Sequence, residues 1–310
     1  FVEKQADLFS APEEFDGELM EYDIIPAVSS LEQARGISKA ATKAGKKAAV
    51  HIKIDTGMGR IGFVPSSKAI DEIIEISKLP NIEIGGAFTH FCTSDEENKD
   101  FTYQQRQKFV NTVSAVEERG VKIPLKHASA SAGIIDFDDM FFNAVRPGII
   151  LYGYYPSNFV KRERMPLKPV MSLKTYAMYV KEIEKGDSVG YGRTYIANEK
   201  RRIATIPAGY ADGVSRLLSN RGYVLINGKR APIRGRVCMD QLMADVTGID
   251  VKPWDEAVIL GRQGNEEITA DEIAGLMGTI SYEVLCLVSK RVPRVYIKGG
   301  QVVKEINYII

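Results

Sequence analysis

The first half of the chain alternates short β-rich runs with amphipathic helical runs. Strands are predicted over residues 23–27, 48–55 and 82–90, and the second of these is almost continuously apolar. Two shorter β-rich runs follow at 125–129 and 142–153. Strands that alternate with helices through short loops predict a parallel sheet with crossover helices.

Helix signals lie between these strands. Ser30, with Gln33 three residues later, forms a capping box, and that helix is predicted to end near Gly45. The next helix places Ile70, Ile73, Ile74 and Leu79 on one face. A longer one over about 101–119 is predicted to end at Gly120.

The second half has a different pattern, with paired β-runs joined by tight-turn dipeptides. Asn227-Gly228 and Gly299-Gly300 each predict a hairpin. Thr269, with Glu272 three residues on, predicts a helix start. We therefore predict a β/α-barrel domain over 1–165 and a mainly β domain over 166–310.

The length of the first domain bears on how complete its barrel is. A (β/α)8 TIM-type barrel takes about 250 residues, or about 31 for each unit. The 165 residues allow five or six units, so we expect an α/β barrel that lacks its first units.

Composition excludes several function classes. The chain has 41 basic and 40 acidic residues and shows no basic stripe, so a nucleic-acid partner is not expected. Apolar runs are too short for a membrane span. Three scattered cysteines predict neither disulfides nor zinc, and no His/Asp/Glu cluster has metal-ligand spacing. A reduced, cytoplasmic protein without metal is expected.

Polar residues gather directly after the predicted strands, where a barrel carries its active site. They are Arg60, His90, Ser129, Ser131 and Arg146. Lys53 is unusual because it lies inside a buried strand, where an unpaired ammonium is unfavourable. Taken singly, Lys53 is also compatible with a lysine at a strand end that reaches solvent, and Arg-Pro-Gly with a simple turn.

Seven stretches, in order, resemble the signature motifs of the alanine racemase family. They are KIDTGMGRIGF (53–63), THFCTSDEEN (89–98), NAVRPGIILYG (143–153), GYGRTY (190–195), IPAGYADGVSR (206–216), GRVCMDQ (235–241) and GTISYEVLC (278–286). They span both predicted domains, so the resemblance covers nearly the whole chain.

The resemblance implies a barrel that holds pyridoxal phosphate and a β domain that completes the active site of the partner in a head-to-tail homodimer. It implies interconversion of L-alanine and D-alanine, which supplies D-alanine for cell-wall peptidoglycan. Such racemisation needs two bases on opposite faces of the cofactor. Serine as a substrate, and a non-catalytic cofactor-binding relative or inert fragment, stay open as alternatives, whereas a metal-dependent barrel enzyme is disfavoured.

The resemblance also assigns the catalytic residues. Tyr191 matches the tyrosine base that enters from the partner subunit, and His90, Arg146 and His127 match the network that supports it. Arg146 matches the arginine that faces the pyridine nitrogen, where a permanently protonated donor weakens the ring as an electron sink. Without the motif, Tyr191 reads as an ordinary packed strand tyrosine.

Other roles follow in the same way. Arg60, Met239 and Tyr210 match substrate-binding positions, and Lys53 matches a lysine that is often carbamylated. The phosphate cradle matches Ser131, Gly148, Ile149 and Tyr282, although Tyr282 alone is equally compatible with a packed helix residue. Cys238 is expected to be a small buried hydrophobe and not a nucleophile.

Two departures from the family pattern stand out. Ala130 occupies a position where many members have asparagine. The motif Lys-Ala-(Asp/Asn)-Ala-Tyr-Gly, whose lysine binds the cofactor covalently, does not occur in these 310 residues. We therefore expect that the segment with this lysine is missing and that the 310 residues alone are inactive.

Overall fold

The chain folds into two compact units, described here from a computed structural model that covers residues 16–309. The first unit ends at Lys168 and the second begins at Pro169, three residues beyond the boundary predicted from the sequence. Each unit is described by itself.

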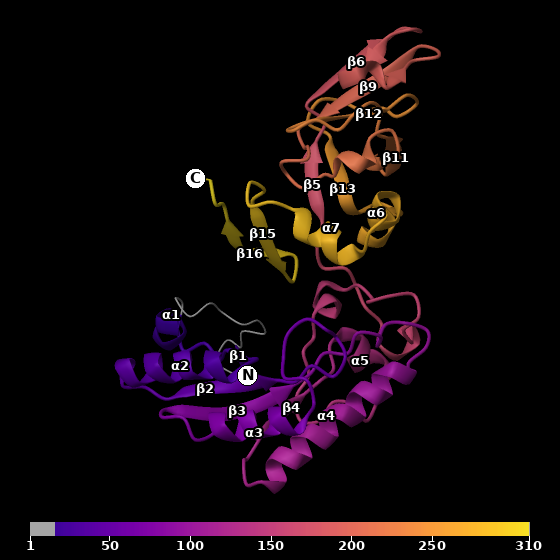
Figure 1. Ribbon diagram of the computed structural model, residues 1–310. Helices are drawn as coiled ribbons and strands as arrows, with labels where there is room; N and C mark the ends of the chain where they lie inside the picture. Colours follow the sequence, from indigo (N-terminus) through magenta and orange to yellow (C-terminus); the bar gives the residue numbers. More distant parts are fainter. Residues whose placement is uncertain (1–15, 310) are drawn as a thin grey trace. The chain divides into compact units, whose positions relative to one another are not determined.

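The first unit is built on four parallel strands in sequential order (Figure 1). They are β1 (Ala27–Val28), β2 (Ala48–Lys53), β3 (Ile82–Phe88) and β4 (Leu125–His127). A single parallel bridge between His127 and Ala144 continues the sheet beyond β4. Sequential parallel order with helical crossovers is the pattern of a β/α barrel.

Helices α2 (Leu31–Ala44), α3 (Ser67–Ile76) and the long α4 (Asp100–Glu118) connect these strands. Further helices and 3-10 turns precede and follow the sheet in the chain: α1 (Asp16–Glu21) before it, and α5 (Ser131–Asp136), η2 (Ile149–Tyr152) and η3 (Arg162–Arg164) after it. The predicted ends of α2 are confirmed: the Ser30 hydroxyl accepts from the Gln33 N–H, and Gly45 ends the helix in the left-handed conformation.

Two predicted strands are shorter than expected. The run 23–27 forms a strand only from Ala27 onward, since Asp23 has a positive φ of 53° and Pro26 has no N–H to donate. The run 142–153 gives one bridge at Ala144 and then the 3-10 turn η2. Pro147 interrupts it for the same reason.

The two faces of β2 have different surroundings. Val50, Ile52 and Ile54 are fully buried in the hydrophobic core, together with residues of α2, α3 and α4. Burial of each such side chain contributes about 1.5–3 kcal/mol. His51 and Lys53 alternate with them and therefore lie on the opposite face, where they are also buried. The polar side chains His51 and Lys53 therefore share one face of β2, and the other face is apolar.

The second unit is mainly β, as predicted. Its strands are β5 (Leu173–Tyr176), β6 (Tyr179–Ile183), β7 (Ser188–Val189), β8 (Tyr195–Ile196), β9 (Arg201–Ile206), β10 (Tyr223–Ile226), β11 (Lys229–Pro232), β12 (Leu242–Asp245), β13 (Glu256–Gln263), β14 (Glu266–Ile268), β15 (Arg294–Lys298) and β16 (Gln301–Ile306). All their pairings are antiparallel. Between β14 and β15 lie the helices α6 (Ala270–Met277) and α7 (Ser281–Leu287).

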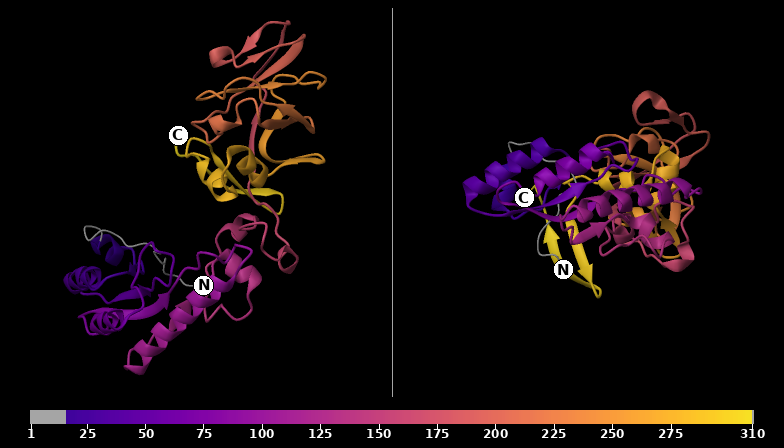
Figure 2. Two further views of the ribbon diagram at one scale, coloured as in Figure 1. Left: turned by 45° about the vertical axis from the view of Figure 1, so that its right-hand side comes forward. Right: turned by 60° about the horizontal axis from the view of Figure 1, so that its bottom comes forward.

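Two larger sheets and two two-stranded sheets, β15–β16 and β7–β8, organise this unit. Strands β11, β10, β13 and β14, with β5 beside β13, form one sheet, and β12, β9 and β6 form another. The Asn227-Gly228 turn joins β10 to β11 with positive φ at both residues, which confirms that predicted hairpin. The β15–β16 hairpin pairs only with itself and stands out as a yellow ribbon in Figure 2.

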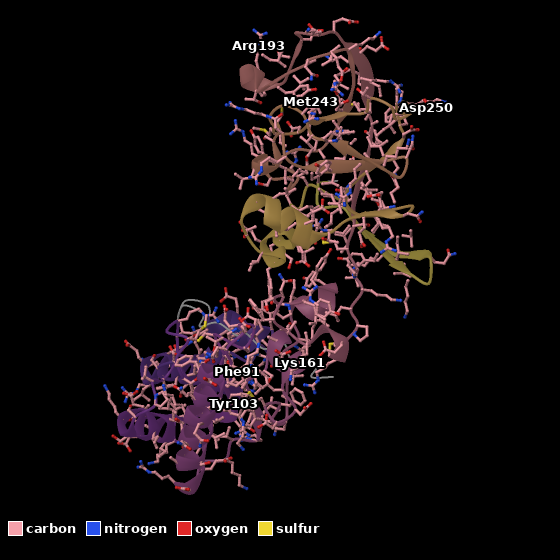
Figure 3. All side chains as sticks on the ribbon, turned by 90° about the vertical axis from the view of Figure 1, so that its right-hand side faces the viewer. Phe91, Tyr103, Lys161, Arg193, Met243 and Asp250 are labelled. Carbon is pink, nitrogen blue, oxygen red and sulfur yellow. The ribbon has the colours of Figure 1, made fainter. Side chains whose placement is uncertain are left out.

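Arg193 lies at the end of the second unit far from α6 and α7 (Figure 3). It belongs to the 3-10 turn η4 (Tyr191–Arg193); another such turn is η5 (Arg216–Leu218). No helix within residues 16–309 combines the length and the apolar character needed to cross a membrane.

Candidate active site

Three neighbouring strands end side by side in the first unit. Lys53 of β2 is in register with Phe88 of β3, and Phe88 is in register with His127 of β4. The Phe88 ring stacks on the His127 imidazole with ring centroids 4.8 Å apart. The carboxyl ends of three parallel strands therefore present a cation, an aromatic ring and an imidazole at one edge.

A glycine allows a contact between β2 and β4 across β3. His51 Nδ1 lies 3.0 Å from His127 Nε2. A side chain at Gly86, which separates the two strands, would place its Cβ 3.0 Å from His51 Nε2 and 2.6 Å from the Leu125 carbonyl. Glycine is therefore required there for the two histidines to meet.

Arg146 is the hub of the polar cluster. Its Nη1 donates to His127 Nδ1 at 2.8 Å, and its Nη2 lies 3.2 Å from His90 Nδ1. Nη2 also donates to the carbonyls of Thr89 and Ala128, both at 2.9 Å. These contacts bring together three of the residues predicted from the sequence, Arg146, His90 and His127.

The N–H donors of Arg146 determine which ring nitrogens of His90 and His127 carry a proton. A guanidinium only donates, so the Nδ1 atoms of His127 and His90 must accept, and both rings are neutral. The Nε2–H of His127 then donates to His51. Burial and then the Arg146 charge lower the pKa of His90 to about 4 and that of His127 to about 2. Burial also lowers the pKa of Arg146, to about 10.

Lys53 is 1% exposed, and its Nζ has no hydrogen-bond partner among residues 16–309. The ammonium lies over the Phe88 ring, with Nζ 4.9 Å from the ring centroid. Burial, with the charge of Arg146 next in size, lowers the pKa of Lys53 to about 8. A buried ammonium without a partner is unfavourable, and burial therefore favours the neutral amine.

A short turn carries the chain from β2 to Arg60. The Asp55 carboxylate accepts from the N–H groups of Gly57 and Gly59, both at 3.0 Å, and these bonds lower its pKa against the opposing effect of burial. Arg60 is exposed, and its charge contributes to the lowered pKa values of Lys53 and His90. Arg60 therefore lies close enough to the cluster to act on it electrostatically.

The predicted phosphate cradle is partly assembled within the first unit. The Gly148 N–H donates to Ser131 Oγ at 3.0 Å, and Ile149 is buried beside it in the chain. Ser131 begins α5, and Ala130 before it makes no side-chain cap. Asparagine at Ala130 would be a good N-cap, so the departure from the family pattern removes a helix cap as well.

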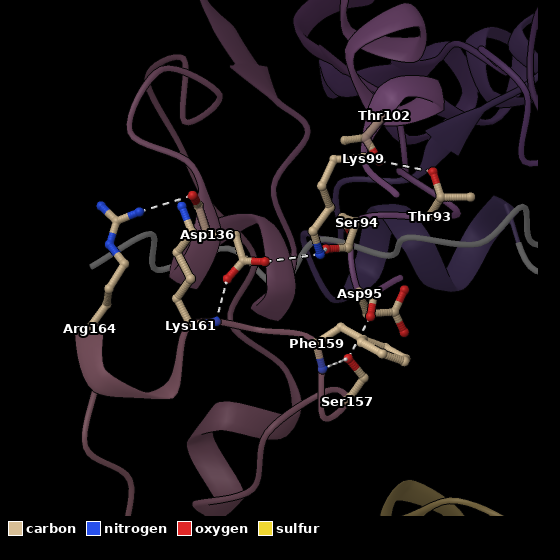
Figure 4. A network of polar contacts seen from close by, with 10 residues as sticks. All are labelled: Thr93, Ser94, Asp95, Lys99, Thr102, Asp136, Ser157, Phe159, Lys161 and Arg164. Carbon is tan, nitrogen blue, oxygen red and sulfur yellow. Dashed lines mark hydrogen bonds and ion pairs between the residues drawn. The ribbon is translucent and has the colours of Figure 1, made fainter. Parts of the chain in front are cut away.

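A network of polar contacts connects the loop after β3 with the end of α5 (Figure 4). Lys99 Nζ pairs with the buried Asp136 carboxylate at 3.0 Å and donates to the Ser94 carbonyl at 2.7 Å. Asp136 also accepts from the Lys161 N–H, and its carbonyl accepts from Arg164. The loop that follows His90 is thereby fixed to the segment that follows Gly148.

The second unit presents its predicted site residues at the surface. Tyr191 is 71% exposed in η4, between Gly190 and Gly192, which both have positive φ. A Cβ at Gly192 would lie 3.2 Å from the Arg236 guanidinium. The turn is therefore held close to the 235–241 segment.

Tyr210 and Met239 lie on two loops that are joined through their backbones. The Tyr210 N–H donates to the Cys238 carbonyl and the Ala211 N–H to the Met239 carbonyl, both at 3.0 Å. Any Cβ at Gly209 would lie 2.2 Å from the Met239 oxygen, so only glycine permits this approach. The structure thus brings Tyr210 and Met239 together, with both side chains exposed.

Tyr282 lies in the first turn of α7 and is partly buried. The loop that carries Tyr210 also meets the end of this helix, since the Ser289 N–H donates to the Asp212 carbonyl. Cys238 is partly exposed, and its thiol donates to the Arg236 carbonyl. Its exposure differs from the fully buried cysteine that we expected.

His51, which the sequence analysis did not single out, is the end of the Arg146–His127–His51 chain. Its signal in the sequence was the two-residue spacing from Lys53 on one strand, which places both on one face. The role of Asp55 in the turn before Arg60 was also missed.

The chemistry of this edge suits an anionic cofactor. Lys53, Arg60 and Arg146 lie near enough for their charges to act on each other or on His90, and Asp55 is the acidic group that acts on Lys53. The Ser131–Gly148 pair offers a hydroxyl and a backbone N–H to a phosphate, and Arg146 offers a cationic donor to a ring nitrogen. The residues present therefore fit pyridoxal phosphate.

Comparison with known proteins identifies the family. The model of the alanine racemase N-terminal domain matches residues 6–156, and that of the C-terminal domain matches residues 170–296. The N-terminal match already begins at residue 6, so it gives no support to the expectation that the segment with the lysine is missing.

Individual relatives agree. An alanine racemase of Clostridium perfringens is 50% identical over 96% of this chain and 78% of that relative. The solved alanine racemase of Clostridium difficile superposes with a TM-score of 0.95 at 43% identity, over 98% of this chain and 79% of that one. That of Bacillus anthracis with bound L-Ala-P gives 0.93 at 36% identity, over 100% and 80%.

These matches confirm the predicted barrel and β-domain architecture, the activity class and the dependence on pyridoxal phosphate. The chain belongs to the alanine racemase family.

Proposed function

We propose that this chain interconverts L-alanine and D-alanine: it removes the α-proton from one face of the bound amino acid and returns a proton on the other. Arg146 is the centre of its cofactor site. The observation that carries the proposal is the Arg146 cluster: a cation whose donors hold two neutral histidines at the carboxyl edge of the barrel strands. When bound, pyridoxal phosphate stabilises the negative charge that remains on the amino acid after the proton leaves.

Arg146 would hold the pyridine nitrogen. It stays protonated even with its pKa lowered to about 10, so it donates a hydrogen bond and leaves that nitrogen unprotonated. His127 and His90 fix the guanidinium in position because both accept from it. This arrangement favours simple proton exchange over transamination.

Tyr191 would be one base, acting in the active site of a partner subunit of a homodimer. Its high exposure supports the proposal, because a tyrosine that acts across an interface is uncovered in its own chain. Met239 and Tyr210, exposed on the joined loops, would bind substrate with it, Met239 through its backbone N–H. Arg60 would bind the substrate carboxylate from the first unit.

Ser131, Gly148, Ile149 and Tyr282 would hold the phosphate. The Gly148 N–H donates to the Ser131 hydroxyl at 3.0 Å, so the two groups lie close enough to bind one anion. D-alanine made here would serve peptidoglycan synthesis.

Lys53 would carry a carbamate that pairs with Arg60. Its neutral amine attacks the carbon of carbon dioxide and loses one proton, which turns a buried cation into an anion beside two arginines. The orphaned Nζ and its lowered pKa support this proposal. Carbon-13-labelled bicarbonate should give a carbamate signal that is lost in Lys53→Met.

The covalent lysine is the remaining element. We propose that the second base is the lysine of the Lys-Ala-(Asp/Asn)-Ala-Tyr-Gly motif, which these 310 residues do not contain. A polypeptide of these residues alone is therefore expected to form no D-alanine from L-alanine. Borohydride reduction with pyridoxal phosphate, followed by peptide mapping, checks this. Turnover together with a labelled lysine among the 310 residues would contradict it.

The function itself is tested in the native protein. L-alanine should be converted to D-alanine only in the presence of pyridoxal phosphate, and Arg146→Leu should abolish the conversion. A protein that binds pyridoxal phosphate without turnover would instead be a non-catalytic relative.

A further inference from the structure

Gln105 of α4 has its side-chain amide buried at the back of the site, with no exposed surface. Its Oε1 accepts from the Cys92 N–H at 2.9 Å and from the Cys92 thiol at 3.4 Å. Its Nε2 donates to Thr56 Oγ1 at 3.3 Å and to the His90 carbonyl at 3.2 Å. Both lone-pair directions and both hydrogens of the amide are therefore used.

These bonds connect two segments that lead to the site. Thr56 follows β2 and starts the turn to Arg60, whereas His90 and Cys92 follow β3. Thr56 Oγ1 lies 2.7 Å from Thr89 Oγ1, and both residues are buried. The Thr89 carbonyl in turn accepts from Arg146 Nη2, so the chain of bonds from Gln105 reaches the hub of the site.

The same helix supports the turn at a second point. A Cβ at Gly57 would lie 2.7 Å from Cζ of Phe101, one turn before Gln105 on α4. Gly57 has a φ of 141°, and its N–H donates to Asp55. The turn before Arg60 is thus packed against α4 on one side and closed by Asp55 on the other.

We propose that Gln105 is a positioning residue of the racemase site, which fixes the backbone of His90 relative to the turn that carries Arg60. An apolar side chain of the same volume would fill the position but would orient neither segment. A fully satisfied buried amide specifies one arrangement of its partners. The inference rests on the proposed function because it concerns the residues assigned there.

The test compares Gln105→Leu and Gln105→Glu with matched changes at Gln107. Gln107 lies on the same helix but is exposed, and its amide donates to the Asn111 side chain on the helix surface. In the native holoenzyme, Gln105→Leu should lower kcat by roughly 10- to 100-fold, the range expected when reacting groups shift by about 1 Å. Gln107→Leu should change kcat less than about 2-fold.

The pH dependence of kcat in Gln105→Glu distinguishes a positioning role from a packing role, because a change in packing alone would not depend on pH. An ionised carboxylate loses both donors and faces the His90 carbonyl, whereas the protonated acid regains one donor. The ratio of its kcat to that of the wild type should therefore rise as the pH falls, while Gln107→Glu keeps a constant ratio. Histidine side-chain NMR should show a shifted His90 signal in both Gln105 variants without any turnover.

Two results would overturn the inference. One is an unshifted His90 signal in both Gln105 variants, and the other is a pH-independent ratio for Gln105→Glu with kcat equal to that of its Gln107 control. If Gln105→Leu does not fold, the pH profile and the His90 signal of Gln105→Glu still test the inference. A wild type without racemase activity refutes the proposed function instead, and the NMR shift still tests the positioning role.

Discussion

The two units present the residues of the proposed site in opposite ways. In the first, Arg146, His127 and His51 form a bonded chain, and both histidines are at most 7% exposed. In the second, Tyr191 is 71% exposed and Met239 is 53% exposed. The proposed site residues of the first unit are preorganised within its own fold, and those of the second unit are left uncovered.

This difference shows that different interactions fix the geometry of the two sets of residues. The first set is fixed by buried hydrogen bonds, which are costly to break because the freed groups would stay unsatisfied. The second set is fixed by backbone at Gly190, Gly192 and Gly209, while its side chains remain open to a partner. Substitutions in the first set should therefore affect stability and catalysis together, and those in the second set catalysis alone.

The largest expected effect is at Tyr191. Tyr191→Phe should lower kcat by roughly 10²- to 10⁴-fold, because it removes one of the two proposed bases. The thermal midpoint should stay the same, since the hydroxyl makes no buried contact. Tyr179→Phe, an exposed tyrosine on β6, serves as the control. A large drop in the midpoint of Tyr191→Phe would show that its role is structural.

Arg146→Lys should affect both properties. The shorter ammonium cannot reach both histidines and both carbonyls, so we expect a loss of about 2–4 kcal/mol in the free energy of unfolding. The rate should also fall. Urea unfolding measures the first quantity, with Arg119→Lys as a control in a surface ion pair with Asp71. Equal free energies of unfolding for the two variants would refute the claim that buried hydrogen bonds fix the site residues of the first unit.

Acid should destabilise the first unit selectively. All three histidines of the chain lie in it, at 51, 90 and 127. Their pKa values are lowered on folding, so the unfolded state binds more protons below pH 6.5. Stability is full above about pH 6.5 and falls as the pH drops toward 4, by about 2–4 kcal/mol at pH 5. Hydrogen exchange should show this in the first unit and not in the second.

The smallest effect is expected at Ser131. Ser131→Ala removes the acceptor of the Gly148 N–H, which should cost about 0.5–1.5 kcal/mol of stability. Affinity for pyridoxal phosphate, measured by titration, should weaken by a similar free energy, or roughly 10-fold at most. Ser66→Ala, at the exposed cap of α3, controls for a lost local bond without affecting the cofactor. An unchanged affinity for pyridoxal phosphate would show that Ser131 does not bind the phosphate.

The sequence predicted the elements whose signals are local. The Ser30 and Thr269 caps and the Asn227-Gly228 turn appear as expected, because a cap or a two-residue turn depends on a few neighbouring residues. The strand at 23–27 was too long because Asp23 takes a positive φ, which its side chain permits but its neighbours do not reveal.

For the site, the sequence by itself determined which side chains follow which strands, since strand order and period place Arg60, His90 and Arg146 at one edge. Only the tertiary structure decided how they are bonded. The meeting of His51 with His127 spans 76 residues and needs Gly86 between them, and the four bonds of Gln105 join three separate segments. Such contacts depend on how strands and helices pack, and no pattern within a single element carries that information.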